Sequence, residues 1–309
     1  MGLFGRIFGR MKPYLNKWAS NTVWFNTTMQ FEGCKAISSI DNFDNVIANL
    51  GSTSGYYAFN YDAAGIKGLN LALPRQSLFA DREMIKNYFS YLQNGAVVII
   101  PLCLFSSLEG EDCDFPDSYY MLLQSESIPN YSWKKKLRIQ RIYNDPILFF
   151  PLFSLVQELR RTMSFRRSSK FDNLEIDANN WIKDWMREFR ITDFDREFSL
   201  VNKDSFESAS RILNEIICFC IDRGFKPVIV VPPISRFLSA KFDERMRKKL
   251  ITDFVNQTDR TIVPFINYLD DNEFADSKFF MNSYFLNEDG AALFTKRVIT
   301  DLKKIGYIL

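Results

Sequence analysis

Histidine is absent from this chain of 309 residues. Without it there is no imidazole general base, no Ser-His-Asp triad and no histidine-ligated metal. Any catalysis by the chain must therefore take its proton acceptor from another type of side chain.

Long hydrophobic runs are also missing, since no stretch approaches the ~20 apolar residues that a membrane-spanning helix requires. The first residues do not resemble a secretory signal, because Arg6 and Arg10 interrupt their apolar positions. Arg6 also stands where a myristoylation motif requires Ser or Thr. The cysteines are odd in number and irregularly spaced, which favours reduced thiols in a cytoplasmic protein. They are Cys34, Cys103, Cys113, Cys218 and Cys220.

A strong net charge is lacking as well, because 39 basic residues are nearly balanced by 37 acidic ones, for a formal charge of +2. The whole-chain charge therefore gives no reason to expect nucleic-acid binding. We expect no bound cofactor. The sequence gives no prediction of the oligomeric state.

The N-terminal segment, residues 1–20, has the pattern of a basic amphipathic helix. Such a helix can lie on an anionic membrane surface, and it can equally pack on its own domain, the alternative that we favour. The apolar positions are Leu3, Phe4, Ile7, Phe8 and Met11, and the basic ones are Arg6, Arg10, Lys12 and Lys17.

Apolar strands alternate with amphipathic helices over most of the chain, which predicts an α/β fold in three layers, with helices on both faces of a central parallel sheet. Continuous apolar runs are typical of strands buried on both faces. We expect strands near 44–50, 66–73, 96–102, 226–233 and 261–269, and helices near 78–93, 204–223, 240–257 and 287–304.

Residues 103–203 interrupt this alternation and are expected to form a mostly helical insertion within a single domain, 21–309. Its charges are segregated, with an acidic segment at 109–126 and a basic one at 134–170. The basic segment also contains the apolar run 147–156, so it shares the composition of an interfacial anchor. The alternative that we favour is burial of Phe149 to Leu155 within the domain, with Pro151 bending the chain.

A turn with glycine at both ends follows the first expected strand, at Gly51, Ser52, Thr53, Ser54 and Gly55. In open parallel sheets, ligands bind beyond the carboxyl ends of the strands. Backbone amides in this turn could form an anion-binding nest. A simple helix cap from the hydroxyl groups explains the same residues, and on spacing alone we favour the cap.

Several blocks of the chain resemble the SGNH (GDSL-type) hydrolase superfamily, most of all its divergent members found near bacterial surface-polysaccharide genes. The blocks are NLGSTSGYYAFNY, then GLNLALPRQ, an apolar strand, and FLNEDGAALFT before the last helix, so the similarity covers residues 44–102 and 204–309. The resemblance implies an α/β/α fold and an ancestry among esterases and carbohydrate acyl-esterases or acyltransferases. It places Thr53, flanked by Ser52 and Ser54, at the position of the nucleophile.

The remaining blocks depart from the family pattern. Asn70 and Leu71 match, but Ala72 replaces the glycine whose amide helps to form the oxyanion hole. The third block lacks its asparagine. At the acid and base positions stand Asn282 and Phe285. Because a hydroxyl group is a weak nucleophile without an adjacent base, these changes predict that conventional serine-hydrolase activity is lost. No spacing selects a substitute base among Lys67, Arg75, Asp276 and Asp289.

Other residues could contribute to a binding site. Arg236 follows the fourth strand at the ligand-binding edge and could hold a carboxylate or phosphate, although a solvated arginine is the simpler interpretation. Trp181 and Trp185, four apart on a helix, favour packing over a sugar-stacking platform. Together, the site residues implied by the turn and the resemblance are Ser52, Thr53 and Ser54, with Gly51, Gly55, Asn70, Ala72, Arg236, Asn282 and Phe285 around them.

Two functions remain open at this stage. The first is a protein that acts on, or only binds, the acyl (O-acetyl) substituents of a surface polysaccharide, with degenerate or atypical catalysis. The second is a non-catalytic assembly protein held at the inner membrane face by its basic and aromatic segments. Both depend partly on the resemblance, because a fold does not fix a function.

Overall fold

The structure is a computed structural model that describes residues 3–110, 115–156, 158, 173–193, 198–258 and 262–307, with the backbone alone for residues 3–8. The chain divides into two compact units. Unit 1 contains residues 1–40 and 115–169, and unit 2 contains residues 41–114 and 170–309. The middle of the expected insertion thus folds together with the N-terminal residues. No helix of the described residues is long and apolar enough to cross a membrane.

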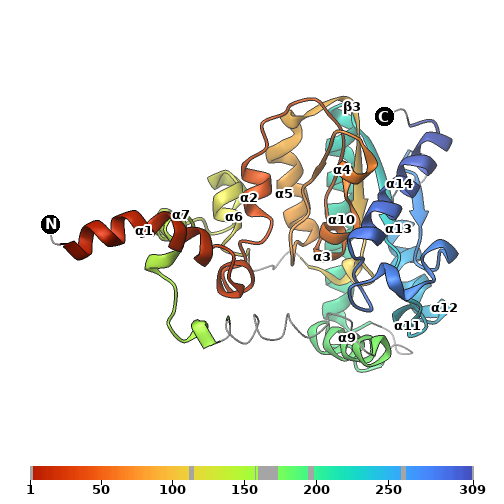
Figure 1. Ribbon diagram of the computed structural model, residues 1–309. Coiled ribbons are helices and arrows are strands. Elements are labelled where there is room, and N and C mark those ends of the chain that lie inside the picture. The colour runs from red at the N-terminus through yellow and green to blue at the C-terminus, as the bar shows by residue number, and fades with distance from the viewer. Residues whose placement is uncertain are drawn as a thin grey trace. The chain divides into compact units, whose positions relative to one another are not determined.

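Unit 2 is built on a parallel sheet of five strands, as the sequence predicted (Figure 1). The strands are β1 (Asn45–Asn49), β2 (Gly68–Asn70), β3 (Leu92–Pro101), β4 (Lys226–Val231) and β5 (Phe265–Asn267). Their order is β2-β1-β3-β4-β5, and every neighbouring pair is parallel. This is the order of flavodoxin-like doubly wound folds, in which the chain reverses its direction of winding between β1 and β3.

Helices cover both faces of this sheet, which completes the three expected layers (Figure 1). On one side α5 (Leu78–Tyr88) packs against α10 (Leu200–Asp222). On the other, α14 (Glu288–Lys304) packs against α3 (Thr53–Ala58) and α4 (Tyr61–Ala64). Because side chains alternate along a strand, one set of positions faces α14. This set contains Ile47, Val97, Ile99, Val228 and Val230, packed with Phe294, Val298 and Leu302.

The ends of several elements differ from the predicted ones for local reasons. β3 begins at Leu92 rather than near residue 96, because Leu92 pairs with Asn45 before the register shifts and Gly95 takes a positive φ of 77°. The expected helix over 240–257 is divided into α12 (Glu244–Arg247), a π-helical turn (Lys248–Thr252) and α13 (Asp253–Val255). α10 begins four residues early, where the Ser199 side chain accepts a hydrogen bond from the Asn202 amide.

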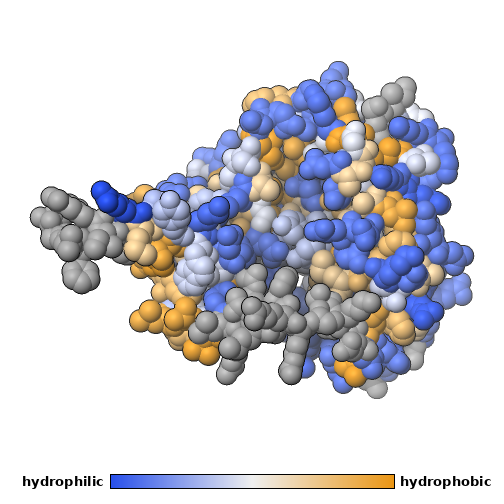
Figure 2. Space-filling model, viewed as in Figure 1, coloured by the Kyte–Doolittle hydropathy of each residue, from blue (hydrophilic) through white to orange (hydrophobic). Residues whose placement is uncertain are grey.

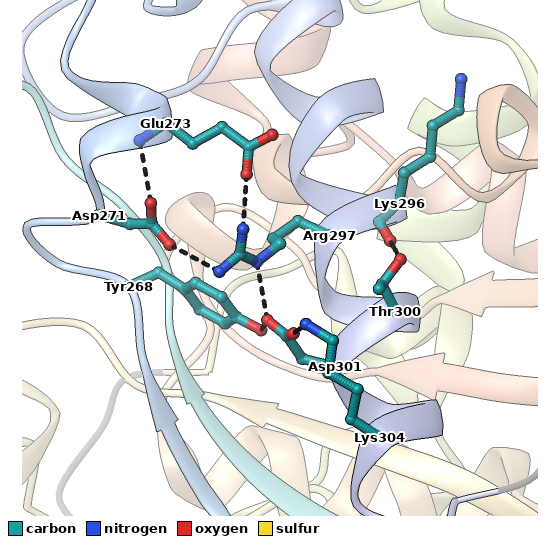
Figure 3. A network of polar contacts seen from close by, with 8 residues as sticks. All are labelled: Tyr268, Asp271, Glu273, Lys296, Arg297, Thr300, Asp301 and Lys304. Atoms are coloured by element: carbon teal, nitrogen blue, oxygen red, sulfur yellow. Dashed lines mark hydrogen bonds and ion pairs between the residues drawn. The ribbon is translucent and has the colours of Figure 1, made fainter.

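Polar contacts fasten α14 to the segment that follows β5 (Figure 3). The Arg297 guanidinium contacts three carboxylates, with N···O distances of 3.1 Å to Glu273, 3.6 Å to Asp271 and 2.8 Å to Asp301. The Tyr268 hydroxyl also donates to Asp301, at 3.0 Å. These contacts help to fix the path of residues 268–287, which carry the expected acid and base positions.

Unit 1 is helical and contains its own aromatic core. Its elements are α1 (Leu3–Ala19), a π-helical turn η1 (Trp24–Thr28), α2 (Cys34–Ser38), α6 (Tyr119–Leu122), a 3-10 turn η4 (Ser125–Ser127), α7 (Trp133–Asn144) and a 3-10 turn η5 (Pro146–Leu148). The Phe31 ring packs against Phe25 and Tyr143, and the Phe150 ring packs against Trp18 and Trp24.

We predict that Gly290→Ala destabilises unit 2 by about 2 kcal/mol or more, because overpacked cores force the backbone to shift. A Cβ atom at Gly290 would lie 2.2 Å from the carbonyl oxygen of Phe279 and 3.0 Å from the Leu286 side chain. Urea denaturation followed by circular dichroism measures the loss. Gly9→Ala is the control, since a Cβ atom there meets nothing within 4 Å. Equal urea midpoints for the Gly290→Ala variant and the wild type would show that the backbone near Phe279 can accommodate the added Cβ atom without loss of stability.

Candidate functional site

The carboxyl edge of the sheet collects the loops that carry most of the predicted site residues. In doubly wound folds the ligand crevice lies at this edge, where the winding reverses between β1 and β3. The loops here follow β1 (residues 50–52), β2 (71–77), β3 (102–109), β4 (232–235) and β5 (268–287). All of them belong to unit 2.

The two glycines that bracket the turn after β1 are required by close packing. Gly51 has a φ of 110°, and a Cβ atom there would lie 3.1 Å from the Pro101 ring. At Gly55 a Cβ atom would lie 2.8 Å from the Leu50 carbonyl oxygen. The Gly51 amide donates to the Asp81 carboxylate at 2.7 Å. This amide, a candidate member of an anion-binding nest, is therefore already bound to an acidic side chain of the protein.

The three hydroxyl residues of the turn have different environments. Ser52 is the N-cap residue of α3, but its side chain makes no capping hydrogen bond, so the predicted side-chain cap is not formed there. The Thr53 hydroxyl, at the expected nucleophile position, accepts a hydrogen bond from the Arg75 amide at 3.4 Å. Ser54 is buried and hydrogen bonds to the Tyr284 side chain.

The Asn70 side chain ties three segments of this edge together. Its amide nitrogen donates to the carbonyl oxygens of Tyr56 at 2.9 Å and Phe59 at 3.3 Å, both at the end of α3. Its oxygen accepts from the Asn49 side chain at 2.9 Å and from the Ala72 amide at 3.1 Å. The amide expected in the oxyanion hole, that of Ala72, is thus bound to Asn70.

The segment 282–287 lies against α3, as the sequence predicted for a site at this edge. The Phe285 ring is buried and lies 5.5 Å from the Tyr57 ring, measured between centroids. Tyr57 is one helical turn beyond Thr53, so Thr53 and Phe285, the expected nucleophile and base positions, belong to neighbouring surfaces. The Asn282 side chain accepts from the amides of Tyr284 at 2.9 Å and Phe285 at 2.7 Å, and so serves as a turn cap.

A helix from the expected insertion covers this segment with aromatic side chains. The helix is α9 (Leu174–Glu188), where Trp181 packs against Phe285 at 5.5 Å and Trp185 packs against Tyr284 at 5.0 Å. The Asp177 carboxylate accepts hydrogen bonds from both the amide and the hydroxyl of Ser283. As expected from their spacing, the two tryptophans are packing residues, and Trp181 packs against the predicted base position.

A polar cluster at the same edge, with Ser106 and Tyr284 buried and Cys103 and Glu109 half-buried, was not singled out from the sequence. The Cys103 thiol lies 3.1 Å from the Ser106 hydroxyl and 4.0 Å from the Glu109 carboxylate, and it hydrogen bonds to Tyr284. Cys103 follows β3 directly, so its position at a strand end was the available signal. A cavity of about 10 Å³, the space of about one water molecule, is lined by Ser54, Cys103 and Tyr284 together with apolar residues.

Burial keeps these groups protonated rather than reactive. It raises the pKa of the Cys103 thiol to about 11, and the Glu109 charge acts in the same direction. Because the thiolate is the nucleophilic form, a thiol of this kind is a weak nucleophile at neutral pH. Burial also raises the pKa of the Glu109 carboxyl to about 8, and that of the Asp81 carboxyl to about 7.

Arg236 does not join this cluster. It begins α11 (Arg236–Ser239), its side chain is exposed, and its guanidinium stacks on the neighbouring Phe237 ring at 5.1 Å. The small cavity is instead lined at this loop by Pro232, Pro233 and Ile234. Among the described residues, no group of histidine, cysteine, aspartate or glutamate side chains has the arrangement of a metal site.

A larger cavity of about 580 Å³ opens between the loop after β3, the end of α9 and the start of α10. This volume falls in the usual range of small-molecule sites. The lining is rich in polar and charged groups, including Glu188, Arg190, Asp204, Ser205 and Ser208.

Comparisons with protein-family models and with curated proteins found no match to this chain.

We predict that Asp81→Asn reduces the pH dependence of stability between about pH 4 and 7, and that the shifted Glu109 carboxyl supplies the part that remains. In the wild type, the unfolded carboxyl ionises near pH 4, whereas the buried carboxyl keeps its proton to about pH 7. Stability should therefore fall as the pH rises through this window, by up to about 4 kcal/mol. Denaturant unfolding measured at several pH values tests the prediction.

The matched control is Asp62→Asn, which changes an exposed carboxylate on α4. It should leave the pH dependence as in the wild type. An identical pH dependence for the wild type and Asp81→Asn would contradict the prediction.

Proposed function

We propose that this chain is an SGNH-hydrolase-like protein that binds an acylated (O-acetyl) surface glycan without hydrolysing it. The proposal combines the resemblance in sequence with the arrangement at the carboxyl edge of the sheet. In this view the hydrolytic machinery of the ancestral fold has been replaced by packing.

The observation that carries the proposal is the environment of Phe285. Its ring fills the expected base position between Tyr57 and Trp181 and can accept no proton. The neighbouring acid position holds Asn282, whose side-chain oxygen is taken up by two backbone amides. Thr53 therefore lacks the adjacent base that a hydroxyl nucleophile requires.

The backbone amides expected in the oxyanion hole and in the anion-binding nest also donate to groups of the protein itself. The Ala72 amide donates to Asn70, and the Gly51 amide donates to Asp81. A preorganised oxyanion hole instead aims free donors at the position where negative charge develops. The cavity beside Ser54 has room for about one water molecule, so an acyl group does not fit there in this conformation.

The cavity at Glu188 and Asp204 provides the space for a glycan. Its volume suits one or two sugar residues, and hydroxyl, carboxylate and guanidinium groups in its lining match the hydrogen-bonding groups of sugars. In this view recognition takes place beside the expected insertion, and the former catalytic edge provides a rigid support.

The charge of unit 1 favours a second function, that of an assembly protein bound peripherally to the membrane. Unit 1 contains 14 basic and five acidic residues, for a formal charge of +9, whereas unit 2 contains 25 basic and 32 acidic residues, for −7. A basic unit of this kind would hold the protein at the anionic inner face of a membrane, on the cytoplasmic side. The two functions are compatible, since lipid-linked glycan precursors are built at such surfaces.

We predict negligible turnover of aryl acetate esters by the purified protein. The wild type should not exceed the Thr53→Ala variant, because Phe285 offers no base to the hydroxyl groups and the raised pKa values of Cys103 and Glu109 disfavour the thiolate. Release of the nitrophenolate chromophore measures the rate. Turnover well above background that is lost in Thr53→Ala, Ser54→Ala or Cys103→Ala would overturn the non-hydrolytic proposal.

We also predict that an O-acetylated oligosaccharide binds at the larger cavity. Loss of a hydrogen bond to a charged group should make binding by Asp204→Ala about tenfold weaker than binding by the wild type. Isothermal titration calorimetry measures the affinity, with Asp62→Ala on α4 as the control for charge. Equal affinities of Asp204→Ala and the wild type would show that the glycan does not bind in this cavity. If neither protein binds the oligosaccharide, the proposal that the chain recognises an O-acetylated glycan is wrong.

A further inference from the structure

The large apolar side chains that remain exposed are concentrated in unit 1. Twelve of the 20 found among the described residues belong to this unit, which has fewer than a third of the residues of the chain. A concentration of exposed large apolar side chains in one part of a protein is the composition expected of an interaction surface. Figure 2 shows orange side chains gathered over the part of unit 1 that follows η5.

α1 presents an exposed apolar stripe with basic residues along its border. Met11, Tyr14 and Trp18 are exposed at spacings of three and four, so they share one side of the helix. Arg10 and Lys17 are exposed on the adjoining side. This is the arrangement of a helix that lies in a membrane interface with its cationic groups at the level of the lipid head groups.

The opposite side of α1 is anchored within unit 1. Lys12 forms an ion pair with Asp145 at 2.7 Å, and the Asn16 side chain hydrogen bonds to Asp145 and to the Ile147 amide, each at 3.1 Å. These contacts hold η5 and the residues after it beside α1. Met11 and Tyr14 therefore lie on the side of α1 that its own unit leaves open, and Trp18, which packs on Phe150, lies at the border of that side.

The segment after η5 is exposed, which corrects the interpretation that Phe149 to Leu155 are buried. Only Phe150 is inserted into the aromatic core, against Trp18 and Trp24. Leu152 is 85% exposed and Phe153 is 81% exposed, and Phe149 and Leu155 are exposed as well. The physical reason is a turn closed by the hydrogen bond from the Ser154 amide to the Pro151 carbonyl oxygen, which buries Ser154 and leaves the two turn residues, Leu152 and Phe153, exposed. Several members of the predicted basic and acidic segments, Arg160, Arg161, Arg166, Arg167, Lys170, Glu111, Asp112 and Asp114, lie outside the described residues, as does Cys113.

α7 repeats the same combination of side chains. Trp133 and Leu137 are exposed at a spacing of four, beside exposed Lys134, Arg138 and Arg141. Its inner side is formed by Ile139 and Ile142, which are buried. Three parts of unit 1 therefore expose apolar side chains, and on both helices cationic side chains lie beside them.

We infer that unit 1 is a membrane-docking module whose partner is a bilayer surface containing anionic lipid. The formal charge of +9 on unit 1 favours a partner with an anionic surface. The exposed aromatic and aliphatic side chains favour a partner that also has an apolar interior. A second unit 1 is disfavoured as the partner because two such units repel each other. The inference deepens the membrane-face location proposed above by assigning it to α1, α7 and the segment 148–156.

Vesicle co-sedimentation tests the inference with the full-length chain. Binding should be strong to phosphatidylcholine vesicles that contain phosphatidylglycerol, weak to phosphatidylcholine alone, and should decrease as salt is added. Arg10→Glu with Lys17→Glu should weaken binding at least about tenfold, since each basic residue contributes about a fivefold factor near an anionic surface. Leu152→Ser with Phe153→Ser should weaken it about tenfold without loss of folding.

Matched controls lie in unit 2. Lys296→Glu with Lys303→Glu changes the net charge equally at exposed positions, and Leu200→Ser with Ile262→Ser removes two exposed apolar side chains. Both controls should bind vesicles as the wild type does.

Three results would overturn the inference. They are equal binding to both kinds of vesicle at low salt, equal losses in the unit 1 and unit 2 variants, and self-association of the lipid-free protein that the Leu152→Ser and Phe153→Ser changes abolish. The last would identify a second copy as the partner. Glycan binding is measured without lipid. A negative vesicle result would therefore contradict only the membrane inference, and a negative calorimetry result would contradict only the glycan proposal.

Discussion

The side chain of Asn70 is the contact on which the carboxyl edge of the sheet most depends. It joins the end of β1 through Asn49, the end of α3 through two carbonyl oxygens, and the loop after β2 through the Ala72 amide. A half-buried amide that satisfies four backbone or side-chain groups is costly to replace, because its loss would leave each of these polar groups without that partner. The turn at Gly51 to Gly55 keeps its shape because these groups hold it on one side and Pro101 on the other.

The aromatic side chains of α9 cover this edge of the sheet and pack against Tyr284 and Phe285. At the position where the sequence resemblance would place an imidazole, the chain packs Phe285 among Tyr57, Trp181 and Tyr284. Aromatic packing of this kind adds stability that a solvated catalytic cleft cannot have. The polar groups left beneath it, Cys103 and Glu109, are buried enough to hold their protons. A site optimised for packing in this way is consistent with the trade-off between stability and activity.

Much of the fold could be predicted from the sequence, because apolar strands and amphipathic helices alternate clearly. The five strands and the last helix follow from the runs at residues 96–102 and 226–231 and from the helical spacing of Phe294, Val298 and Leu302. The positions of Phe285 and of the turn at Gly51 at one edge follow from the rule that parallel strands end on the same side. The irregular ends of β3 could not be predicted, since they depend on a register shift against Asn45.

The candidate site was less accessible to prediction for a physical reason. Contacts between Cys103 and Tyr284, or between Asp177 and Ser283, join residues more than 100 positions apart, and no local pattern encodes them. The association of residues 115–169 with residues 1–40 is of the same kind. The exposure of Leu152 and Phe153 could not be predicted either, because a run of apolar residues in the sequence is equally compatible with a buried core and with an exposed interaction surface.

The division of charge between the two units also has a consequence for handling the protein. A formal charge of +2 describes neither surface, since one unit is strongly cationic and the other strongly anionic. Near neutral pH the behaviour of such a molecule on an ion-exchange column is set by the unit that meets the resin rather than by the net charge of the whole chain. The same chain should consequently be retained by cation exchangers through unit 1 and by anion exchangers through unit 2, at ionic strengths low enough to leave both fields unscreened.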